Sequence, residues 1–249
     1  MFNTIHPKKE NIPGLKRLWA EAFGDSDEQI GVFFDTAFSP DLCMCTVENQ
    51  QIIAAAYWLD CSYDGGKLAY LYAVATAQSH RGQGHCHRLL DQIHTLLAKR
   101  NYAGSILVPD EGLSSFYGAM GYAFFGGMET FSCQAGTPVP LKKINCTEYA
   151  ALRRQFLPDG GVVQEKENLV YLNEISQFYT GEGVLLAATK EDKNLTCTEL
   201  LGDHCQAPGI VATLECTLGQ FRCPGRDQFA MFRSLNNAPV PSYFGFAFD

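Results

Sequence analysis

The sequence has no C-x-x-C pair, no run of about 20 apolar residues, and no apolar stretch close to its N-terminus. The missing cysteine pairs argue against structural zinc, because such sites are usually built from paired cysteines. The missing apolar stretches argue against a membrane span and against a signal peptide. We therefore expect a cytoplasmic protein that contacts no membrane and needs no metal.

Basic residues are also scarce, with 19 Lys and Arg against 27 Asp and Glu, a net charge of -8 and a pI near 5.2. A general nucleic-acid binder carries a basic stripe, so this class is excluded. The acidic balance is compatible with a cationic small substrate such as an amine. The ten cysteines stand mostly alone among apolar residues, as small buried hydrophobes do in a reducing cytosol.

The first half of the chain alternates between helical and strand patterns. The first helix is expected to begin near Asn11, to carry Trp19 on its apolar face and to end at Gly24, and Asp25 or Ser26 is expected to cap the second. The remaining expected elements are strands 42–47, 52–59 and 68–75, a helix 83–99, a strand 104–108, a short helix 113–120 and a strand 122–131. This order predicts an α/β (α+β) fold with a mixed central sheet and helices on both faces.

The second half repeats part of that order after a linker at 135–140. The expected elements are helices 148–156 and 165–178 and strands 184–189 and 195–201, followed by an apolar ending at 243–249 that is expected to be a strand. The order echoes residues 12–60, and no glycine-rich loop follows. We therefore predict two domains, 1–134 and 141–249, the second being a smaller, degenerate copy without a catalytic site.

The stretch from Arg81 to Cys86 is the most informative part of the sequence. A strand runs into a turn that contains Gly82 and Gly84, and the turn runs into a helix. Unpaired N–H groups at a helix start, glycines that allow close approach and a neighbouring arginine together form a site for a pyrophosphate. A P-loop lysine is absent, and His87 stands where a dinucleotide fingerprint has its third glycine. A plain surface turn capped by glycines stays open as an alternative.

This stretch resembles the acetyl-CoA loop of the GCN5-related N-acetyltransferase superfamily, written Gln/Arg-x-x-Gly-x-Gly/Ala. The resemblance covers 74–76 and 80–84, while Ser79 departs from the leading Gln/Arg. Farther along, 116–122 resembles the family's Tyr-x-x-x-Gly-Phe element. The two-part build is similar to acetyltransferases of the enhanced-intracellular-survival type, which carry a second, degenerate acetyltransferase-like domain.

The resemblance implies an N-acetyltransferase that moves an acetyl group from acetyl-CoA to a primary amine by direct attack. It implies that 72–75 splays from 104–108 and that an N–H near Val74 faces the oxyanion. Tyr117 is expected to act as general acid, since a phenol stays protonated at neutral pH. The base is a water chain or, by analogy, the carboxylate of Asp249. The residues expected to bind the cofactor are Ala73, Val74, Ala75, Arg81, Gly82, Gln83, Gly84, His85, Cys86 and Ser114.

Other interpretations remain open at this point. A non-catalytic acyl-CoA-binding module with a protein-recruiting second domain would release no CoA with any amine. Acyl chains longer than acetyl, the identity of the acceptor amine and a homodimer are equally undecided by the residues. The position of Cys86 at a helix start predicts a lowered thiol pKa, although a packed, inert side chain is also compatible.

Overall fold

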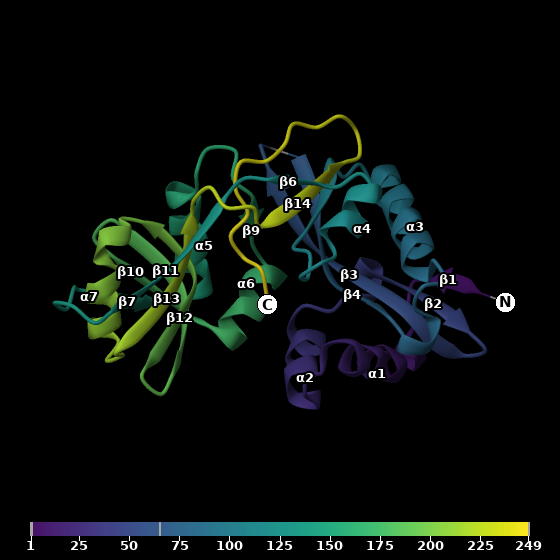
Figure 1. Cartoon of the computed structure of the whole chain (residues 1–249), viewed down its shortest axis with the longest axis horizontal. Coiled ribbons are helices and arrows are strands. Elements are labelled where there is room, and N and C mark those ends of the chain that lie inside the picture. Colours follow the sequence, from purple (N-terminus) through teal and green to yellow (C-terminus); the bar gives the residue numbers. More distant parts are fainter. Residues whose placement is uncertain (1, 65, 249) are drawn as a thin grey trace.

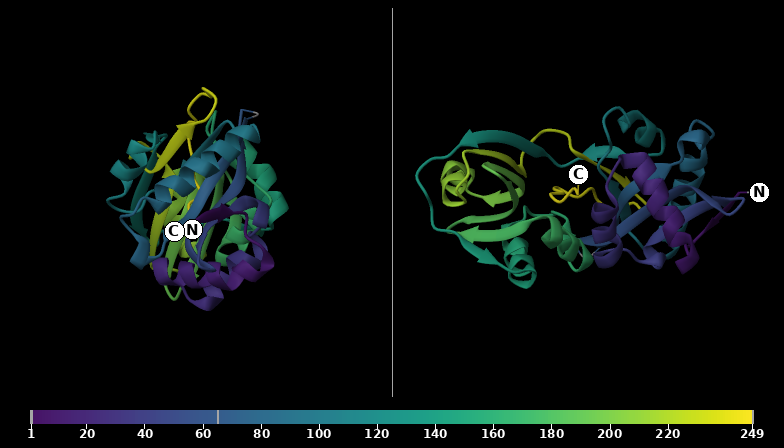
Figure 2. Two further views of the ribbon diagram at one scale, coloured as in Figure 1. Left: turned by 90° about the vertical axis from the view of Figure 1, so that its right-hand side faces the viewer. Right: turned by 90° about the horizontal axis from the view of Figure 1, so that it is seen from below.

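A computed structural model describes residues 2–64 and 66–248, in which the chain builds two mixed β-sheets with helices packed on them (Figure 1). The first sheet has the strand order β1-β2-β3-β4-β5-β14-β6, with β9 paired to β3, and the second has the order β7-β13-β12-β11-β10-β8. Figure 2 shows the two sheets as two lobes, with the described C-terminal end between them. The predicted α/β class and the mixed sheet are confirmed.

The described helices are α1 Ile12–Phe23, α2 Asp27–Thr36, α3 His85–Lys99, α4 Ser114–Ala119, α5 Cys146–Phe156, α6 Glu167–Ile175 and α7 Ala207–Thr213. The strands of the first sheet are β1 Asn3–Ile5, β2 Cys43–Glu48, β3 Gln51–Tyr63, β4 Gly66–Thr76, β5 Gly104–Leu107, β6 Ala123–Phe125, β9 Val163–Gln164 and β14 Ala230–Ser234. Those of the second sheet are β7 Met128–Gln134, β8 Lys142–Ile144, β10 Gln177–Gly181, β11 Val184–Glu191, β12 Asn194–Gly202 and β13 Leu218–Pro224.

The helix boundaries follow local chemistry. Gly24 ends α1 in the left-handed conformation, with φ +77°, and its N–H donates to the carbonyl of Ala20. Ser26 caps α2, because its hydroxyl accepts from the N–H of Gln29. The side-chain oxygen of Gln29 accepts in turn from the N–H of Ser26. Both predicted helices are confirmed. They could be predicted because caps and apolar spacing depend on residues only a few positions apart.

The two halves exchange strands, which corrects the predicted division into 1–134 and 141–249. Strand β14, late in the chain, lies between β5 and β6 of the first sheet, where Met231 pairs with Leu107 and with Phe124. Strand β7 in return pairs with β13 of the second sheet. Figure 1 shows β14, in yellow, beside β6 in the first lobe. Alternation of side chains predicts that a strand exists but carries no information about its sheet.

A glycine pair separates the two strands that we had predicted as one strand over 122–131. Gly126 has φ +57°, and a Cβ on Gly127 would lie 2.0 Å from the carbonyl oxygen of Gly225. The backbone turns there, and the chain passes from β6 in the first sheet to β7 in the second. The close approach of two backbones explains why neither position has a side chain.

The second half repeats the order of the first, from α5 and α6 through β10, β11 and β12 to α7 and β13. Strand β12 pairs in parallel with β13, as β4 pairs with β5. After β12, however, the carboxylate of Asp203 accepts from the N–H of Cys205 at 3.0 Å. An amide N–H of this turn is thus already bonded to a carboxylate of the protein, so the turn in the second lobe is less suited to bind an external anion.

A buried polar chain joins α3 to β14 across the first lobe. His94, only 4% exposed, accepts a hydrogen bond from Arg233 at Nδ1, 2.8 Å, and its Nε2 lies 2.8 Å from the hydroxyl of Tyr122. That hydroxyl also lies 2.6 Å from the Ser105 hydroxyl on β5. Burial, followed by the charge of Arg233, lowers the pKa of His94 to about 3. His94 is therefore neutral in the folded protein at neutral pH.

We expect this neutral histidine to make the free energy of unfolding fall with decreasing pH. An unfolded His94 takes up a proton below about pH 6.5, whereas the folded one does so only near pH 3. Its stability contribution is complete above pH 6.5 and is lost as the pH falls toward 3, at up to about 1.4 kcal/mol per pH unit. Urea unfolding between pH 7 and 4.5 measures this slope, which His94→Gln should make shallower.

The matched control for this slope is Gln92→Ala on the exposed face of the same helix, which changes no titratable group. This variant should keep the wild-type slope. An unchanged slope in His94→Gln would contradict the neutral, buried histidine.

The C-terminal segment 243–248 is a buried, irregular strap and not part of the strand that we predicted over 243–249. One isolated bridge joins Tyr243 to Gly161, and Phe244, Phe246 and Phe248 are all buried. Asp249 lies outside the described residues. Side chains of the strap contact both lobes, so its apolar pattern reflects burial on several sides and not pairing in a ladder.

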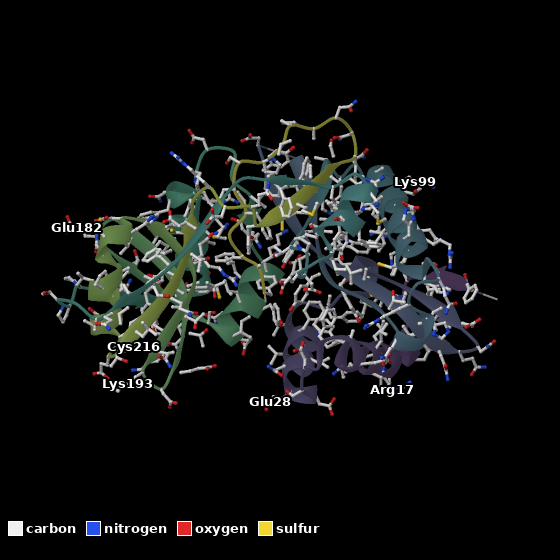
Figure 3. The ribbon with its side chains drawn as sticks, in the orientation of Figure 1. Arg17, Glu28, Lys99, Glu182, Lys193 and Cys216 are labelled. Carbon is white, nitrogen blue, oxygen red and sulfur yellow. The ribbon has the colours of Figure 1, made fainter. Side chains whose placement is uncertain are left out.

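Charged side chains gather on the outside of both lobes. Figure 3 shows Lys99 at the periphery of the first lobe and Glu182 and Lys193 at that of the second. Among the described residues, no helix combines the length and the apolar character that crossing a membrane requires.

Candidate active site

Strand β4 diverges from β5 at a bulge. The parallel pairing of the two strands runs from Leu68 opposite Gly104 to Tyr70 opposite Ile106 and then stops. On the other side, the register with β3 shifts between Ala55 and Tyr57. Ala73 has φ +47°, and neither it nor Val74 has a partner in the described pairing registers of β4. The predicted splay is therefore present, and it leaves backbone groups of the bulge without strand partners.

The glycine turn leads from β4 into α3. Gly82 and Gly84 have φ +73° and φ +76°, a conformation that glycine adopts at little cost. In the described part of the chain, the N–H groups from Gly82 to His87 donate to no other backbone group, and the first such bond of α3 is that of Arg88 to the Gly84 carbonyl. Consecutive free N–H groups at the positive end of a helix form an anion cradle.

Two exposed arginines flank this cradle, and sequence reasoning identified only one of them. Arg81 donates to the carbonyl of Thr76 at 3.1 Å. Arg88 folds back from the first turn of α3 and donates to the carbonyl of Gln83 at 3.0 Å. A Cβ on Gly84 would lie 3.2 Å from the guanidinium of Arg88. The spacing of four residues from Gly84, which is one helical turn, was the signal that could have identified Arg88.

Ser79, which departs from the family pattern, has its side chain engaged by its neighbour. Its hydroxyl lies 2.8 Å from Nδ1 of His80, whose Nε2 lies 3.1 Å from a carboxylate oxygen of Glu48. Gln83 donates in addition to the carbonyl of Ser79 at 3.1 Å. These bonds hold the loop in shape, so the cradle does not depend on a long side chain at position 79.

His85 and Cys86 begin α3, and each offers its N–H to the cradle. The ring of His85 is buried against Phe2, at 4.5 Å between centroids, and burial with the charge of Arg88 lowers its pKa. Burial raises the pKa of the Cys86 thiol to about 11. The predicted lowering of this pKa is wrong, because the loss of water around the thiol outweighs the helix dipole. Cys86 packs against the apolar cluster that α3 covers.

Tyr117 lies on α4 with only 7% of its surface exposed, beside Phe116 and Tyr122. Burial is the main cause that raises the pKa of its phenol, and the neighbouring Cys86 adds to it. The phenol is therefore protonated throughout the neutral range. Among the described residues, its hydroxyl has no hydrogen-bond partner, so its proton remains available to a bound group. Ser114, half-buried, begins the same helix.

An aromatic cluster covers the other side of the bulge. The hydroxyl of Tyr72 donates to the carbonyl of Phe248 at 3.0 Å and lies 3.3 Å from the hydroxyl of Tyr171. Trp19 packs against Tyr72 at 5.5 Å and donates its indole N–H to Asp25 at 2.7 Å. Sequence reasoning treated Trp19 and Asp25 only as helix and cap residues, because their convergence depends on the packing of α1 against β4.

Two acidic residues bear on the choice of a base. Asp60 on β3 accepts from Tyr102 at 2.5 Å and pairs with Lys67 at 2.8 Å, so its carboxylate is engaged within the sheet. Asp249, the predicted base, lies outside the described residues. Among the described residues, no three metal-ligating side chains come together.

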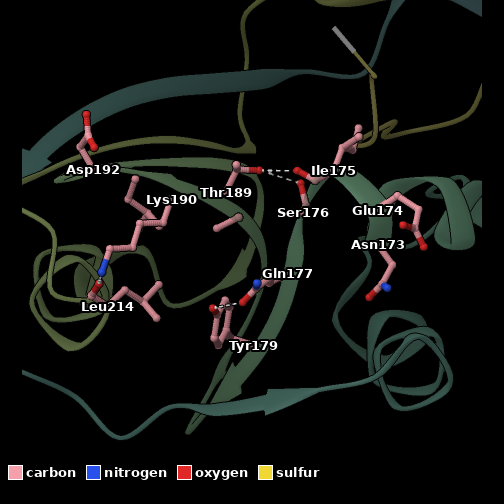
Figure 4. Close-up of a pocket in the computed structure, with 12 residues that line it drawn as sticks. Asn173, Glu174, Ile175, Ser176, Gln177, Tyr179, Thr189, Lys190, Asp192 and Leu214 are labelled. Carbon is pink, nitrogen blue, oxygen red and sulfur yellow. Dashed lines mark hydrogen bonds between the residues drawn. The ribbon is translucent and has the colours of Figure 1, made fainter. Parts of the chain in front are cut away.

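A surface hollow of about 510 Å³ lies on the second lobe, lined mainly by side chains of α6, β10 and β11 (Figure 4). The labelled Ser176 and Thr189 bond each other at its wall, at 3.2 Å, and Lys190 donates to the carbonyl of Leu214. None of the predicted site residues lines it. The candidate site is therefore sought in the first lobe, where the bulge, the cradle and Tyr117 lie.

The first lobe has a mixed sheet, a splayed strand pair and an anion cradle at the start of the following helix. The resemblance to an acyltransferase family implied this arrangement. Residues 4–125 match the sequence model described as an acetyltransferase (GNAT) domain. This part of the chain belongs to that family. It contains the bulge, the cradle and Tyr117, so the predicted family is confirmed where the site lies.

Comparison with solved structures extends the similarity of fold to the second lobe. A GCN5-related N-acetyltransferase from Kribbella flavida matches with a TM-score of 0.73 and 17% identity, covering 94% of this chain and 71% of that one. A GCN5-related N-acetyltransferase from Anabaena variabilis matches with a TM-score of 0.77 and 14% identity, covering 95% of this chain and 73% of that one. A tandem GNAT protein from the clavulanic acid biosynthesis pathway matches with a TM-score of 0.59 and 10% identity, covering 96% of this chain and 100% of that one. No curated protein matches the sequence.

Proposed function

We propose that this protein transfers the acetyl group of acetyl-CoA to a primary amine by direct attack, using the site of the first lobe. The observation that carries the proposal is the cradle of free N–H groups from Gly82 to His87, which lies beside the bulge of β4. Such a cradle suits a pyrophosphate, and Arg81 and Arg88 supply positive charge beside it. The residues present therefore fit the cofactor.

The bound thioester supplies the acetyl group, and the chain supplies its orientation. We assign the binding of the pyrophosphate to the cradle and that of the pantetheine arm to the backbone of Ala73, Val74 and Ala75, which lies beyond the last residue of β4 that pairs with β5. An N–H of this bulge is suited to stabilise the negative charge that develops on the carbonyl oxygen. Holding two reactants in line accounts for a large part of the rate in such reactions.

Two groups are assigned to proton movement and acceptor binding. Tyr117 is the proposed general acid, because its raised pKa keeps a proton ready for the leaving thiolate. Asp25, held by Trp19 beside Tyr72, is suited to attract the ammonium form of an amine before it loses a proton. A water chain or Asp249 remains our hypothesis for the base.

The test of the proposed function is calorimetric titration with acetyl-CoA and with CoA. Wild type should bind both, and Gly84→Glu should bind about a hundredfold more weakly or not at all. A glutamate at Gly84 places negative charge in the cradle, and its Cβ meets the Arg88 guanidinium at 3.2 Å in a backbone with φ +76°. Release of free thiol with a panel of amines then separates an enzyme from a non-catalytic acyl-CoA binder.

The matched control is Gly183→Glu, in the second lobe, since Gly183 has φ +70° and no atom closer than 4.0 Å to an added Cβ. It carries the same backbone strain and the same charge away from the cradle. If wild type fails to bind at tens of micromolar protein, or if both variants bind equally well, the cradle is only a glycine-capped helix start.

A further inference from the structure

The strap from Tyr243 to Phe248 passes from the second lobe to the bulge of β4. At its far end, Phe248 accepts a hydrogen bond from Tyr72 through its carbonyl, and its N–H donates to Tyr70 at 3.4 Å. Its ring packs against the rings of Tyr70 and Tyr72, with centroids 5.6 Å away in both cases, and against Tyr171 at 5.0 Å. Phe248 therefore forms a wall on the acceptor side of the proposed site.

The near end of the strap is fixed to a buried ion pair of the second lobe. Arg153 on α5 and Glu199 on β12 form two bonds, at 2.8 and 2.9 Å, with side chains 2% and 0% exposed. Tyr243 donates to Glu199 at 3.1 Å, and the guanidinium of Arg153 lies 4.2 Å from the centre of the Phe246 ring. The strap thus rests on both members of the pair.

Two further contacts leave the strap little freedom between its ends. The side chain of Gln164 donates to the carbonyl of Phe246 at 3.0 Å and accepts from its N–H at 3.2 Å. Gly245 lies so close to Glu199 that an added Cβ would be 1.7 Å from its carboxylate oxygen. A glycine at this position is therefore required for the strap to lie against the ion pair.

The buried charges of Arg153 and Glu199 destabilise the fold unless each of them has its full set of hydrogen-bond partners. Two charges removed from water gain little net stability from pairing, and apolar replacements are often equally stable. Such a pair is explained better by what it positions than by its stability. Here the donors around Glu199 come from α5 and from the strap, so its charge selects one position of the strap.

We propose that Glu199 and Arg153 position the strap so that Phe248 shapes the acceptor side of the transfer site, which makes Glu199 a positioning residue for the reaction. The inference rests on the proposed function for its kinetic part. The second lobe, whose corresponding turn has an amide bonded to Asp203, then serves the reaction of the first through this strap.

The test compares Gly245→Ala and Glu199→Gln with wild type by three measurements. Hydrogen exchange of the peptide that covers 243–248 should rise at least about tenfold in rate for both variants, because the protected amides of Phe246 and Phe248 open. With an amine that wild type acetylates, kcat should fall about tenfold or more. Affinity for acetyl-CoA, measured by calorimetry, should stay within about twofold, since the cradle is not touched.

The control is Arg154→Gln, which removes an exposed ion pair with Glu165 from the same helix as Arg153. It should change none of the three measurements. Unchanged exchange in both variants overturns the positioning role, and raised exchange with unchanged kcat overturns the link to the reaction. A general loss of packing would raise exchange over β13 too, which also counts against the proposal. If wild type fails to bind acetyl-CoA, the proposed function fails, while the exchange result still decides the positioning role.

Discussion

Removal of residues 135–249 is expected to leave a first half that does not fold cooperatively. Strand β14 separates β5 from β6, so its loss exposes the backbone of β5, whose four residues are all buried. The ring of Phe232 on β14 also fills the space over Gly104, where an added Cβ would lie 2.2 Å away. Thermal unfolding followed by circular dichroism should show no sigmoidal transition for the fragment 1–134, in contrast to the whole chain.

A linked fragment serves as the control. Residues 1–126 joined by a flexible linker to 227–249 restore β14 without the second sheet, and this chain should regain a transition, at a lower midpoint than the whole protein. A cooperative transition at the wild-type midpoint for 1–134 alone would show that the exchanged strand contributes nothing. The outcome also decides whether the site can be studied on the isolated acetyltransferase (GNAT) region 4–125.

Tyr117→Phe is expected to lower kcat by about two to four orders of magnitude while leaving the affinity for acetyl-CoA nearly unchanged. The phenol is buried beside Cys86 with a raised pKa, so the change removes a proton without creating a large cavity. Steady-state thiol release and calorimetry measure the two effects separately. Because the pKa is raised above 10, the wild-type rate should show no loss from Tyr117 ionisation up to about pH 10.

Tyr102→Phe is a suitable comparison, because Tyr102 is buried in the same apolar cluster but bonds Asp60 at the other end of the sheet. It should reduce stability and leave kcat within about twofold. Equal losses in kcat for the two variants would assign Tyr117 to packing under the loop and would leave the leaving thiolate to be protonated by water.

Local patterns predicted the first lobe well. Apolar residues at helical spacing predicted a helix over 83–99, and the structure has α3 there. Of the five residues on this apolar face, Leu89, Leu90, Ile93 and Leu97 are buried and Leu96 is half-buried. The glycines of the cradle were identified because a residue without a Cβ lets the backbone approach a phosphate closely, and because they match the family's loop. These features depend on residues within one or two turns of each other, which is the range over which a single sequence is informative.

Features that depend on distant residues were not predicted. Nothing near Ala230–Ser234 indicates that this strand pairs with β5, and β13 was not recognised as a strand. The pKa of the Cys86 thiol was predicted to be lowered but is raised, because the burial of this side chain could not be known from the sequence. The convergence of Trp19, Asp25 and Phe248 on Tyr72 likewise follows from tertiary packing, and no spacing along the chain encodes it.

The exchanged strand also sets an order of events during synthesis. A ribosome adds residues from the N-terminus, so β1 to β6 leave the exit tunnel long before β14 does. Until then, β5 and β6 have unpaired edges that other chains can occupy, and a slow step of strand insertion must follow. The nascent protein is therefore expected to depend on protection from aggregation from the synthesis of β5 until that of β14, which is about half of its translation.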